Sequence, residues 1–522
     1  MMMTIFSPKA RWGMSPAALL VLVQMLAGCA VNPVTGKRDL ILVSEEQELA
    51  MGEQAYAPTQ QSQGGIYDVD PELTAYISEV GQRLAAQSDR QLPYEFVVLN
   101  NSVPNAWALP GGKIAINRGL LTELESEAEL AAVLGHEIVH AAARHSAQQV
   151  SRGMLSQVLV VATAVIASDS DYGSLAVGGA GIGAQLINSR YGRDAELESD
   201  RYGMIYMSRA GYDPQGAVSL QETFVRLNDG HETDWVNGLF ASHPPSTERV
   251  QANRAMAAEL PAGGELGVER YQRHLARTRE LEPAYTAYEE GRAALGEGDA
   301  ELAMQKADAA LATFAGEANF HALKGDVYLE RENYPAAIDA YSKAVDLRGS
   351  FFYYPLQRGL VHKRLGDLDA AVRDLERSSA LMPTAPAEFA LGQIAEERGD
   401  IDAAIEHYTV VARAGGDYGK AAQQSIARIQ LPDHAGNYFA VRCAADRSGN
   451  LVVAVQNRAG VATSNIVVAV DFMGGDGRER RLSRELQGPL APDEVGQVAT
   501  GLGPYTGTSC PASVVSARVA EN

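Results

Sequence analysis

The sequence lacks any cluster of lysine and arginine that could form a surface for nucleic acid. Its 44 Lys and Arg residues are outnumbered by 65 Asp and Glu residues, and the formal net charge is −21 at pH 7. Because nucleic-acid phosphates require clustered positive charge, we exclude nucleic acid as a partner. Hydrophobic residues make up 46% and charged residues 21%, a balance typical of globular domains rather than disordered chains or multi-span membrane proteins.

Apolar runs long enough to cross a membrane are also lacking. Lys9 and Arg11 precede an apolar run at 17–25, shorter than the roughly 20 residues that a bilayer requires. The LAGC stretch that follows, ending at Cys29, resembles a bacterial lipoprotein signal. It implies a signal peptide over 1–28 and a lipid on Cys29; the alternative is an uncleaved transmembrane helix. Ala30, in place of an aspartate, favours sorting to the outer membrane, so we expect a periplasmic protein anchored in its inner leaflet.

Cysteine is scarce, and besides Cys29 the chain has only Cys443 and Cys510. An exported protein reaches an oxidising compartment, in which such a pair is expected to form a disulfide. The alternative is two buried free thiols.

Four segments follow from the residue patterns: the signal at 1–28, a mixed helix and strand segment at 29–270, a repeat at 284–430, and Val-rich alternating runs at 435–522 that predict a small β-sandwich. In the repeat, glycines recur about every 34 residues, and an alanine follows each of them twelve positions later. This pattern resembles tetratricopeptide repeats and predicts four helical hairpins, an α-solenoid that binds partners and does no chemistry. The glycines are Gly291, Gly325, Gly359 and Gly392, and the alanines are Ala303, Ala337, Ala371 and Ala404.

The candidate metal-binding and catalytic residues are concentrated in the stretch LGHEIVHAAARH, within an expected helix at 124–150. Residues four apart lie on one side of a helix, so His136 and His140 can bind one ion, with Glu137 beside them. His145 is predicted to be solvated near the end of the helix.

A zinc site needs a third protein ligand and an open position. Glu196, in SRYGRDAELESDRYG, is the candidate, and Asp200 follows four residues later on the same helical face. Glu198 is a rival ligand by spacing, although its side chain should point away if Glu196 faces the metal.

Together these motifs resemble the zinc metalloprotease family of the CAAX prenyl protease and HtpX. Two further stretches carry the resemblance, NAWALPGGKIAINRGLL from Asn105 and SHPPSTER from Ser242. The resemblance implies an α+β gluzincin-type domain with one Zn²⁺, bound by His136, His140 and Glu196. It also implies a substrate that adds as a strand to an exposed edge. The implied substrate-binding residues are Asn105, Ala106, Trp107, Ala108 and Arg249.

The resemblance also implies roles for three catalytic residues. Glu137 would act as the general base. Asp200 corresponds to a residue described as a proton donor, although we prefer a carboxylate that orients a ligand histidine. His243 would either occupy the open position of zinc as a latch, which we favour, or steady the oxyanion; the alternative is a surface histidine near a helix start at Ser246 or Thr247.

The family's periplasmic members that carry repeats imply a function in the cell envelope. We expect a zinc endopeptidase that degrades misfolded or stalled outer-membrane proteins and assists their assembly, with the β-barrel assembly machinery as partner of the repeats. The alternative is a chaperone-like scaffold with a latent protease. The small-residue-rich stretches at 153–168 and 175–187 are too short to span a bilayer and predict a hairpin near the active site.

Overall fold

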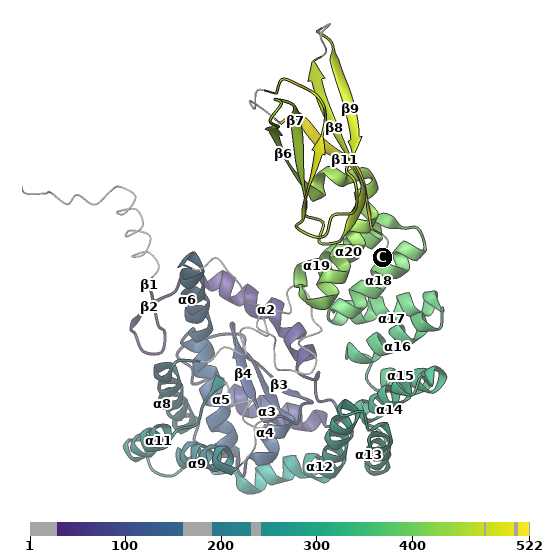
Figure 1. Cartoon of the computed structure of the whole chain (residues 1–522). Coiled ribbons are helices and arrows are strands. Elements are labelled where there is room, and N and C mark those ends of the chain that lie inside the picture. The colour runs from purple at the N-terminus through teal and green to yellow at the C-terminus, as the bar shows by residue number, and fades with distance from the viewer. Residues whose placement is uncertain (1–28, 160–190, 231–241, 474–476, 506–509, 521–522) are drawn as a thin grey trace, which may run out of the picture. The chain divides into compact units, whose positions relative to one another are not determined.

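The structure, a computed structural model, describes residues 29–159, 191–230, 242–473, 477–505 and 510–520 (Figure 1). These residues form two compact units, which divide between Lys324 and Gly325, within helix α14 (Ala318–Glu330). Among the described helices, none combines the length and the apolar character needed to cross a bilayer. The expected signal at 1–28 and most of the expected hairpin at 153–187 lie outside the described residues.

A three-stranded sheet organises the first unit. Strand β5 (Lys113–Asn117) lies between β3 (Glu95–Leu99), to which it is parallel, and β4 (Ala106–Leu109), to which it is antiparallel. Helix α2 (Glu45–Ser62) contributes Ala55 and Tyr56 to an apolar cluster with side chains of the sheet. Helix α5 (Glu127–Ala142) packs on β4 and β5, so the helix that carries His136 and His140 has a fixed base.

The expected single helix at 124–150 is wrong, because the chain breaks between α5 and α6 (His145–Leu159). Arg144 between them has a left-handed φ of 63°, which cannot continue a right-handed helix. Its guanidinium holds this conformation: Nε donates to Glu48 Oε2 at 2.6 Å and Nη2 donates to the Val43 carbonyl at 3.0 Å. The break places His145 at the first position of α6.

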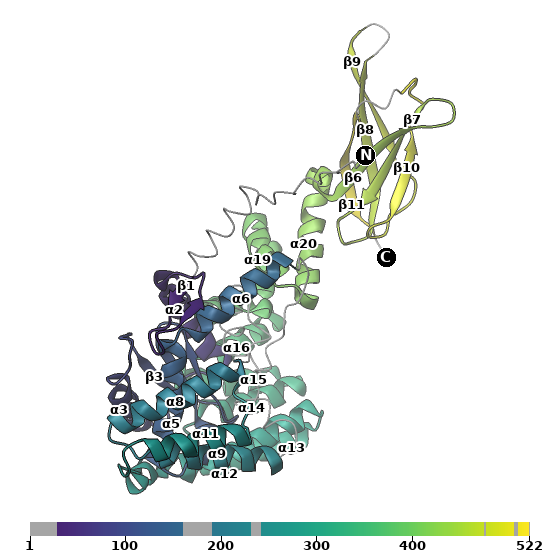
Figure 2. The same ribbon diagram turned by 90° about the vertical axis from the view of Figure 1, so that its left-hand side faces the viewer.

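Helices α8 (Arg193–Arg209) and α9 (Gln215–Gly230) pack on α5, and α11 (Thr247–Glu259) packs on α8 and α9, as Figures 1 and 2 show. The backbones of α5 and α8 come close at Gly135 and Gly203, where a Cβ on Gly203 would lie 3.0 Å from the Gly135 carbonyl carbon. Glycine at both positions therefore permits the approach that brings α8 against the histidines of α5.

The remaining elements of the first unit frame this core. A short antiparallel hairpin of β1 and β2 opens the described chain, and α3 packs on β3. These elements are β1 (Cys29–Val31), β2 (Arg38–Leu40), α3 (Pro71–Ala85), α4 (Arg118–Glu123), α12 (Val268–Gly296) and α13 (Ala300–Thr313).

Helix α12 is continuous from the mixed helix and strand segment into the repeats, so the domain limits expected at 270 and 284 both fall inside one helix. Arg118, which is almost fully buried, lies over the ring of Tyr285, with its guanidinium carbon 3.5 Å from the ring centroid. The Tyr285 hydroxyl donates to Glu317 Oε2 at 2.8 Å. These buried polar contacts connect the end of β5 with the first repeat.

The repeats form helical hairpins as the sequence predicts. Added Cβ atoms at Gly325, Gly359 and Gly392 would come within 3 Å of Tyr341, Leu375 and Tyr408 respectively. Small residues therefore let the two helices of each hairpin approach while large ones fill the interface. The helices after α14 are α15 (Tyr334–Leu347), α16 (Tyr353–Arg364), α17 (Leu368–Leu381), α18 (Ala385–Glu397), α19 (Ile401–Ala414) and α20 (Gly416–His434).

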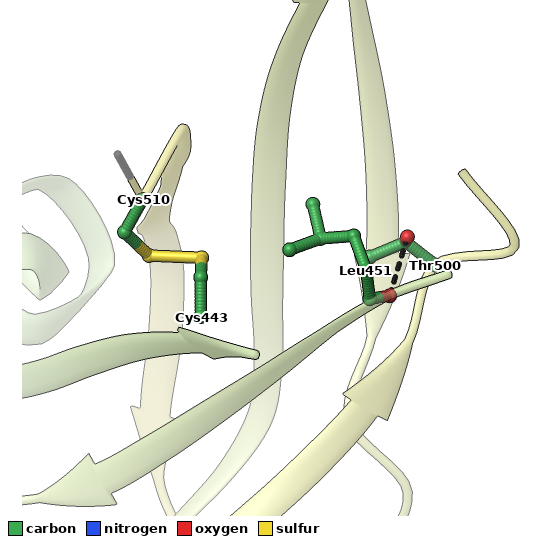
Figure 3. The surroundings of a disulfide bond; sticks show 4 residues. All are labelled: Cys443, Leu451, Thr500 and Cys510. Atoms are coloured by element: carbon green, nitrogen blue, oxygen red, sulfur yellow. Dashed lines mark hydrogen bonds between the residues drawn. A yellow bond between two sulfur atoms is a disulfide. The ribbon is translucent and has the colours of Figure 1, made fainter. Parts of the chain in front are cut away.

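The C-terminal segment forms two three-stranded antiparallel sheets, β10-β7-β6 and β11-β8-β9, that share one apolar core with α20. This agrees with the predicted sandwich. Cys443 on β6 and Cys510, just before β11, form a disulfide that links the two sheets, and Figure 3 shows it. The strands are β6 (Phe439–Ala445), β7 (Leu451–Asn457), β8 (Thr463–Met473), β9 (Glu479–Glu485), β10 (Val495–Ala499) and β11 (Ala512–Val519).

Candidate metal centre

Four buried side chains from three segments converge at one point. They are His136 and His140 of α5, Glu196 of α8, and His243 from the loop before α11, and one ligand atom from each lies within 4.8 Å of all the others. The two Nε2 atoms of His136 and His140 are 2.9 Å apart. Each lies 3.5 Å from an oxygen of Glu196. The structure thus brings together the three residues that the sequence predicts as ligands, and adds His243.

A pair of charged residues stands behind this cluster. Asp200 Oδ1 lies 2.9 Å from His136 Nδ1, the ring nitrogen turned away from the cluster. Arg249 donates to both oxygens of Asp200, at 2.6 and 2.7 Å, and its Nη1 lies 2.9 Å from Glu196 Oε2. Asp200 is therefore placed to orient His136, and Arg249 fixes both carboxylates.

Burial and neighbouring charge shift the pKa values of His140, Glu196 and Asp200. Burial holds the pKa of His140 well below its usual value, which favours the neutral ring that a metal binds. Burial alone would raise the pKa of Glu196, but His243, His136 and His140 hold it well below its usual range. For Asp200, the raising effect of burial is likewise outweighed by Arg249, so its pKa is lowered. The cluster thus offers the neutral ring of His140 and the anionic carboxylate of Glu196.

Glu137 lies directly beside the cluster. Its Oε1 is 3.7 Å from His243 Nε2, and its Oε2 finds no hydrogen-bond partner within the described part of the chain. Burial raises the pKa of Glu137. A buried carboxylate with an unsatisfied oxygen and a raised pKa is suited to accept a proton from a reacting water.

This donor set fits zinc. Imidazole nitrogens and a carboxylate oxygen are ligands that Zn²⁺ binds in tetrahedral sites, and catalytic sites use three protein ligands. His136, His140 and Glu196 provide them, and the rear nitrogen of His136 has the carboxylate partner that ligand histidines need.

Two predictions about neighbouring histidines have different outcomes. The prediction that His145 is solvated is wrong: it is 3% exposed, and its Nδ1 lies 2.9 Å from His140 Nδ1. The chain break at Arg144 turns this ring inward. His243 is 4% exposed, which excludes the surface alternative; Ser246 caps α11 without it by accepting from the Arg249 amide.

Glu198 points away from the cluster, as expected if Glu196 faces it. Its Oε1 lies 3.4 Å from His145 Nε2 and accepts a hydrogen bond from Asn32 Nδ2 at 2.9 Å. Sequence spacing alone left Glu198 as a rival ligand, whereas these contacts hold its carboxylate away from the cluster.

The side chains of β4, the strand predicted to receive the substrate, are buried rather than exposed. It is an edge strand of its sheet, yet each residue from Ala106 to Leu109 is at most 6% exposed. Helices α2 and α5 both contact this strand, and the Trp107 ring packs edge-on against Tyr56. Asn105, just before the strand, accepts a backbone hydrogen bond from Asn117 through its carbonyl at 2.8 Å.

An apolar cavity adjoins the cluster instead. His136, Glu137, His243 and Arg249 contribute to its wall, which otherwise consists mainly of apolar side chains of α5, α8 and α9. The apolar wall includes Val133, Met204, Met207, Leu220 and Phe224.

Sequence reasoning missed Tyr191. Its ring stacks on His140 with centroids 3.9 Å apart, and its hydroxyl lies 3.0 Å from Ser146 Oγ. Burial raises the pKa of the Tyr191 hydroxyl. Nothing in the spacing of this residue from the two motifs indicates the contact, which depends on how the chain enters α8.

Comparison with known proteins assigns these features to a family. A model described as Peptidase family M48 matches residues 71–257, which contain the whole cluster, and a tetratricopeptide repeat model matches 288–350 and 356–419. Metalloprotease YcaL of Escherichia coli (strain K12) is 31% identical over 196 residues, which cover 35% of this chain and 72% of YcaL. This chain belongs to peptidase family M48. The resemblance to zinc metalloproteases and the predicted fold class are thereby confirmed.

Two further relatives match a larger number of residues. Mitochondrial metalloendopeptidase OMA1 of Schizosaccharomyces pombe is 33% identical over 226 residues, 42% of this chain and 64% of that protein. The beta-barrel assembly-enhancing protease of Yersinia pestis is 32% identical over 259 residues, 47% of this chain and 52% of that protein. The chain thus spans about half the length of this curated M48 relative.

Proposed function

We propose that this chain is a zinc-dependent endopeptidase of the cell envelope. The observation that carries the proposal is the buried set of His136, His140 and Glu196, with the unsatisfied carboxylate of Glu137 beside it. A buried cluster of these donors would be costly to maintain without a cation, and the M48 match supports its use in peptide hydrolysis.

Each residue of the site would have a distinct task in the reaction. Zinc, when bound, would polarise the scissile carbonyl and lower the pKa of water. Glu137 would accept the proton from the attacking water and pass it to the departing amine, and its raised pKa favours holding that proton between the two steps. Asp200 and Arg249 would keep His136 and Glu196 in place. The apolar cavity would accept an apolar side chain next to the scissile bond.

His243 would keep the site closed at rest. Its Nδ1 lies 3.0 Å from Glu196 Oε1 and 3.3 Å from His136 Nε2, so the ring stands where the fourth donor of a metal would be. An extended substrate would have to displace it. This arrangement supports the latch rather than the oxyanion role, because the ring faces the ligands.

The substrates that we propose are misfolded or stalled outer-membrane proteins, which the protease would degrade or help to assemble. Curated relatives from Yersinia pestis and Vibrio cholerae bear the name beta-barrel assembly-enhancing protease, the latter as a putative one. The repeats would bind the β-barrel assembly machinery, since stacked helical hairpins present a surface for protein partners. Lipid on Cys29 would hold the protein on the inner leaflet of the outer membrane.

A second candidate is a chaperone-like scaffold with a dormant protease. The observation that favours it is the same closed cluster, since His243 occupies the position that a substrate must open. The two candidates differ in what Glu137 does: a scaffold would work equally well without it.

A pulse-chase experiment on a stalled β-barrel protein tests the proposal. Cells would express either the wild type or Glu137→Gln at equal levels. We expect the wild type alone to degrade the stalled protein. Equal clearance by both forms would contradict the protease and favour the scaffold. Fractionation of a Cys29→Ser variant tests the anchor, because loss of the lipid should release the protein from the membrane fraction.

A further inference from the structure

His140 is supported from behind by a chain of polar contacts that the proposed reaction does not use. His145 Nδ1 lies 2.9 Å from His140 Nδ1, and His145 Nε2 lies 3.4 Å from Glu198 Oε1. The same Glu198 oxygen accepts a hydrogen bond from Asn32 Nδ2 at 2.9 Å. Three of these residues are buried and Glu198 is partly buried, so water does not readily replace the contacts.

The positions of the protons in this series of polar contacts follow from one requirement. His140 must present a bare Nε2 to a metal, so its proton lies on Nδ1 and is donated to His145. His145 must then accept through a bare Nδ1, which places its own proton on Nε2, facing Glu198. A carboxylate can accept from both His145 and Asn32. Every donor therefore meets an acceptor in a single arrangement, and that arrangement orients the lone pair of His140 toward the cluster.

The N-terminal hairpin holds Asn32, the residue at the far end of this series of polar contacts. Asn32 lies in the turn between β1 and β2, where its Oδ1 accepts from the Val34 amide at 2.9 Å and its backbone amide donates to the Lys37 carbonyl at 2.8 Å. Asn32 Nδ2 also donates to Asp39 Oδ2 of β2 at 3.2 Å. The side chain that contacts Glu198 is thus fixed by the hairpin that begins at Cys29.

We propose that His145 and Glu198 are positioning residues for the metal ligand His140, and that the hairpin over residues 29–40 holds this relay through Asn32. The proposal rests on the proposed zinc function and deepens it. The two ligand histidines are supported differently: His136 by the charged pair of Asp200 and Arg249, and His140 by the imidazole of His145, which in turn contacts Glu198. A hairpin that ends at Leu40, far before α5 begins at Glu127, thereby contributes to the metal site.

Zinc affinity of the purified full chain tests the relay directly. We expect His145→Leu to weaken zinc binding by about 10- to 100-fold in competition with a chelator, the range typical when a partner of a ligand histidine is lost. His145→Asn retains an acceptor near the position of Nδ1 and should lose less. His362→Leu, in the repeats, removes a histidine far from the relay in sequence and should bind zinc as the wild type does.

A charge exchange tests the hairpin end of the relay. Asn32→Asp retains the oxygen that accepts from Val34 but places a second carboxylate against Glu198, so zinc binding should weaken. Adding Glu198→Gln restores a donor between the two side chains and should recover much of the affinity. A residue that serves only the stability of the fold would not be rescued in this way. Visible spectra of the cobalt-loaded proteins should report the same order, because a displaced His140 changes the ligand geometry.

The outcomes separate the relay from the function on which it rests. A wild type that binds neither zinc nor cobalt overturns the proposed function and the relay with it. The relay alone is overturned if the wild type binds zinc and a folded His145→Leu protein binds it with equal affinity and gives the same cobalt spectrum. If His145→Leu does not fold, equal zinc affinity of the wild type and Asn32→Asp has the same meaning.

Discussion

Arg249 donates two charge-assisted hydrogen bonds to Asp200, from Nε at 2.6 Å and from Nη2 at 2.7 Å, while Asp200 lies 2.9 Å from His136. The pair is buried, and Arg249 also lies 2.9 Å from Glu196. One guanidinium thus compensates two carboxylates that would otherwise repel each other in a medium of low polarity.

Replacing Arg249 by methionine should therefore destabilise the metal-free protein strongly. We expect Arg249→Met to lower the free energy of unfolding of the first unit by about 3 to 5 kcal/mol, the range for breaking a buried ion pair. Urea titration in the presence of a chelator measures it. Arg193→Met is the control, since Arg193 pairs with Glu248 in an exposed position and its loss should leave stability almost unchanged. Equal effects of the two substitutions would contradict the role given to Arg249.

His243→Ala tests the latch. Removing the ring opens the fourth position beside Glu196, so basal cleavage of an unfolded protein and self-cleavage should both rise. An oxyanion role predicts the opposite, a fall of about 100-fold. The double variant with Glu137→Gln should show no self-cleavage, which identifies the cleavage as the protein's own. Unchanged activity in His243→Ala would remove the residue from the reaction altogether.

The two metal motifs could be predicted from the sequence because their geometry is local. A four-residue step on one helix places His136 beside His140, and the same step places Glu196 and Asp200 on one face of α8. The regular spacing of Gly325, Gly359 and Gly392 likewise predicts the repeats, and each of these glycines meets the large side chain that follows 16 positions later. Such patterns need no knowledge of the tertiary fold.

Features that depend on long-range contacts could not be predicted. His145 was misplaced because the helix break at Arg144 is stabilised by Glu48, almost a hundred residues away. Burial of β4 depends on α2 and α5, which flank it only in the folded chain. The same limit applies to Tyr191, whose stacking on His140 joins two separate segments.

The disulfide should contribute strongly to the stability of the β-sandwich. Cys443 and Cys510 are separated by 67 positions, and closing a loop of this length stabilises the folded state by about 4 kcal/mol in the chain-entropy model. We expect Cys443→Ser and the double variant Cys443→Ser/Cys510→Ser to lose similar stability, since either breaks the bond. Two reactive thiols per chain at these positions, found on labelling the unreduced and unfolded protein, would refute the pairing.

Stability of the second unit should depend on pH through His407 and Glu388, whose side chains lie 2.7 Å apart. The hydrogen bond to Glu388 raises the pKa of His407. Burial alone would raise the pKa of Glu388, but the contact with His407 outweighs burial and lowers it. The His407 contribution is complete below the pKa of unfolded histidine, near 6.5, and is lost as pH rises through the raised value. Unfolding at pH 6 and pH 8 should show this loss, and His407→Gln should abolish it. A pH dependence that survives in His407→Gln would assign the effect to other groups.

The central claim is that this chain is a zinc-dependent endopeptidase. Its most direct test measures zinc content and proteolysis together on the purified wild type, Glu137→Gln and His140→Ala. Glu137 acts on the proton and does not bind the metal, so Glu137→Gln should retain one zinc ion per chain and lose cleavage of an unfolded β-barrel protein by at least about 100-fold. His140→Ala should lose both zinc and cleavage, because it removes a ligand. A Glu137→Gln protein that cleaves at the wild-type rate would contradict the account.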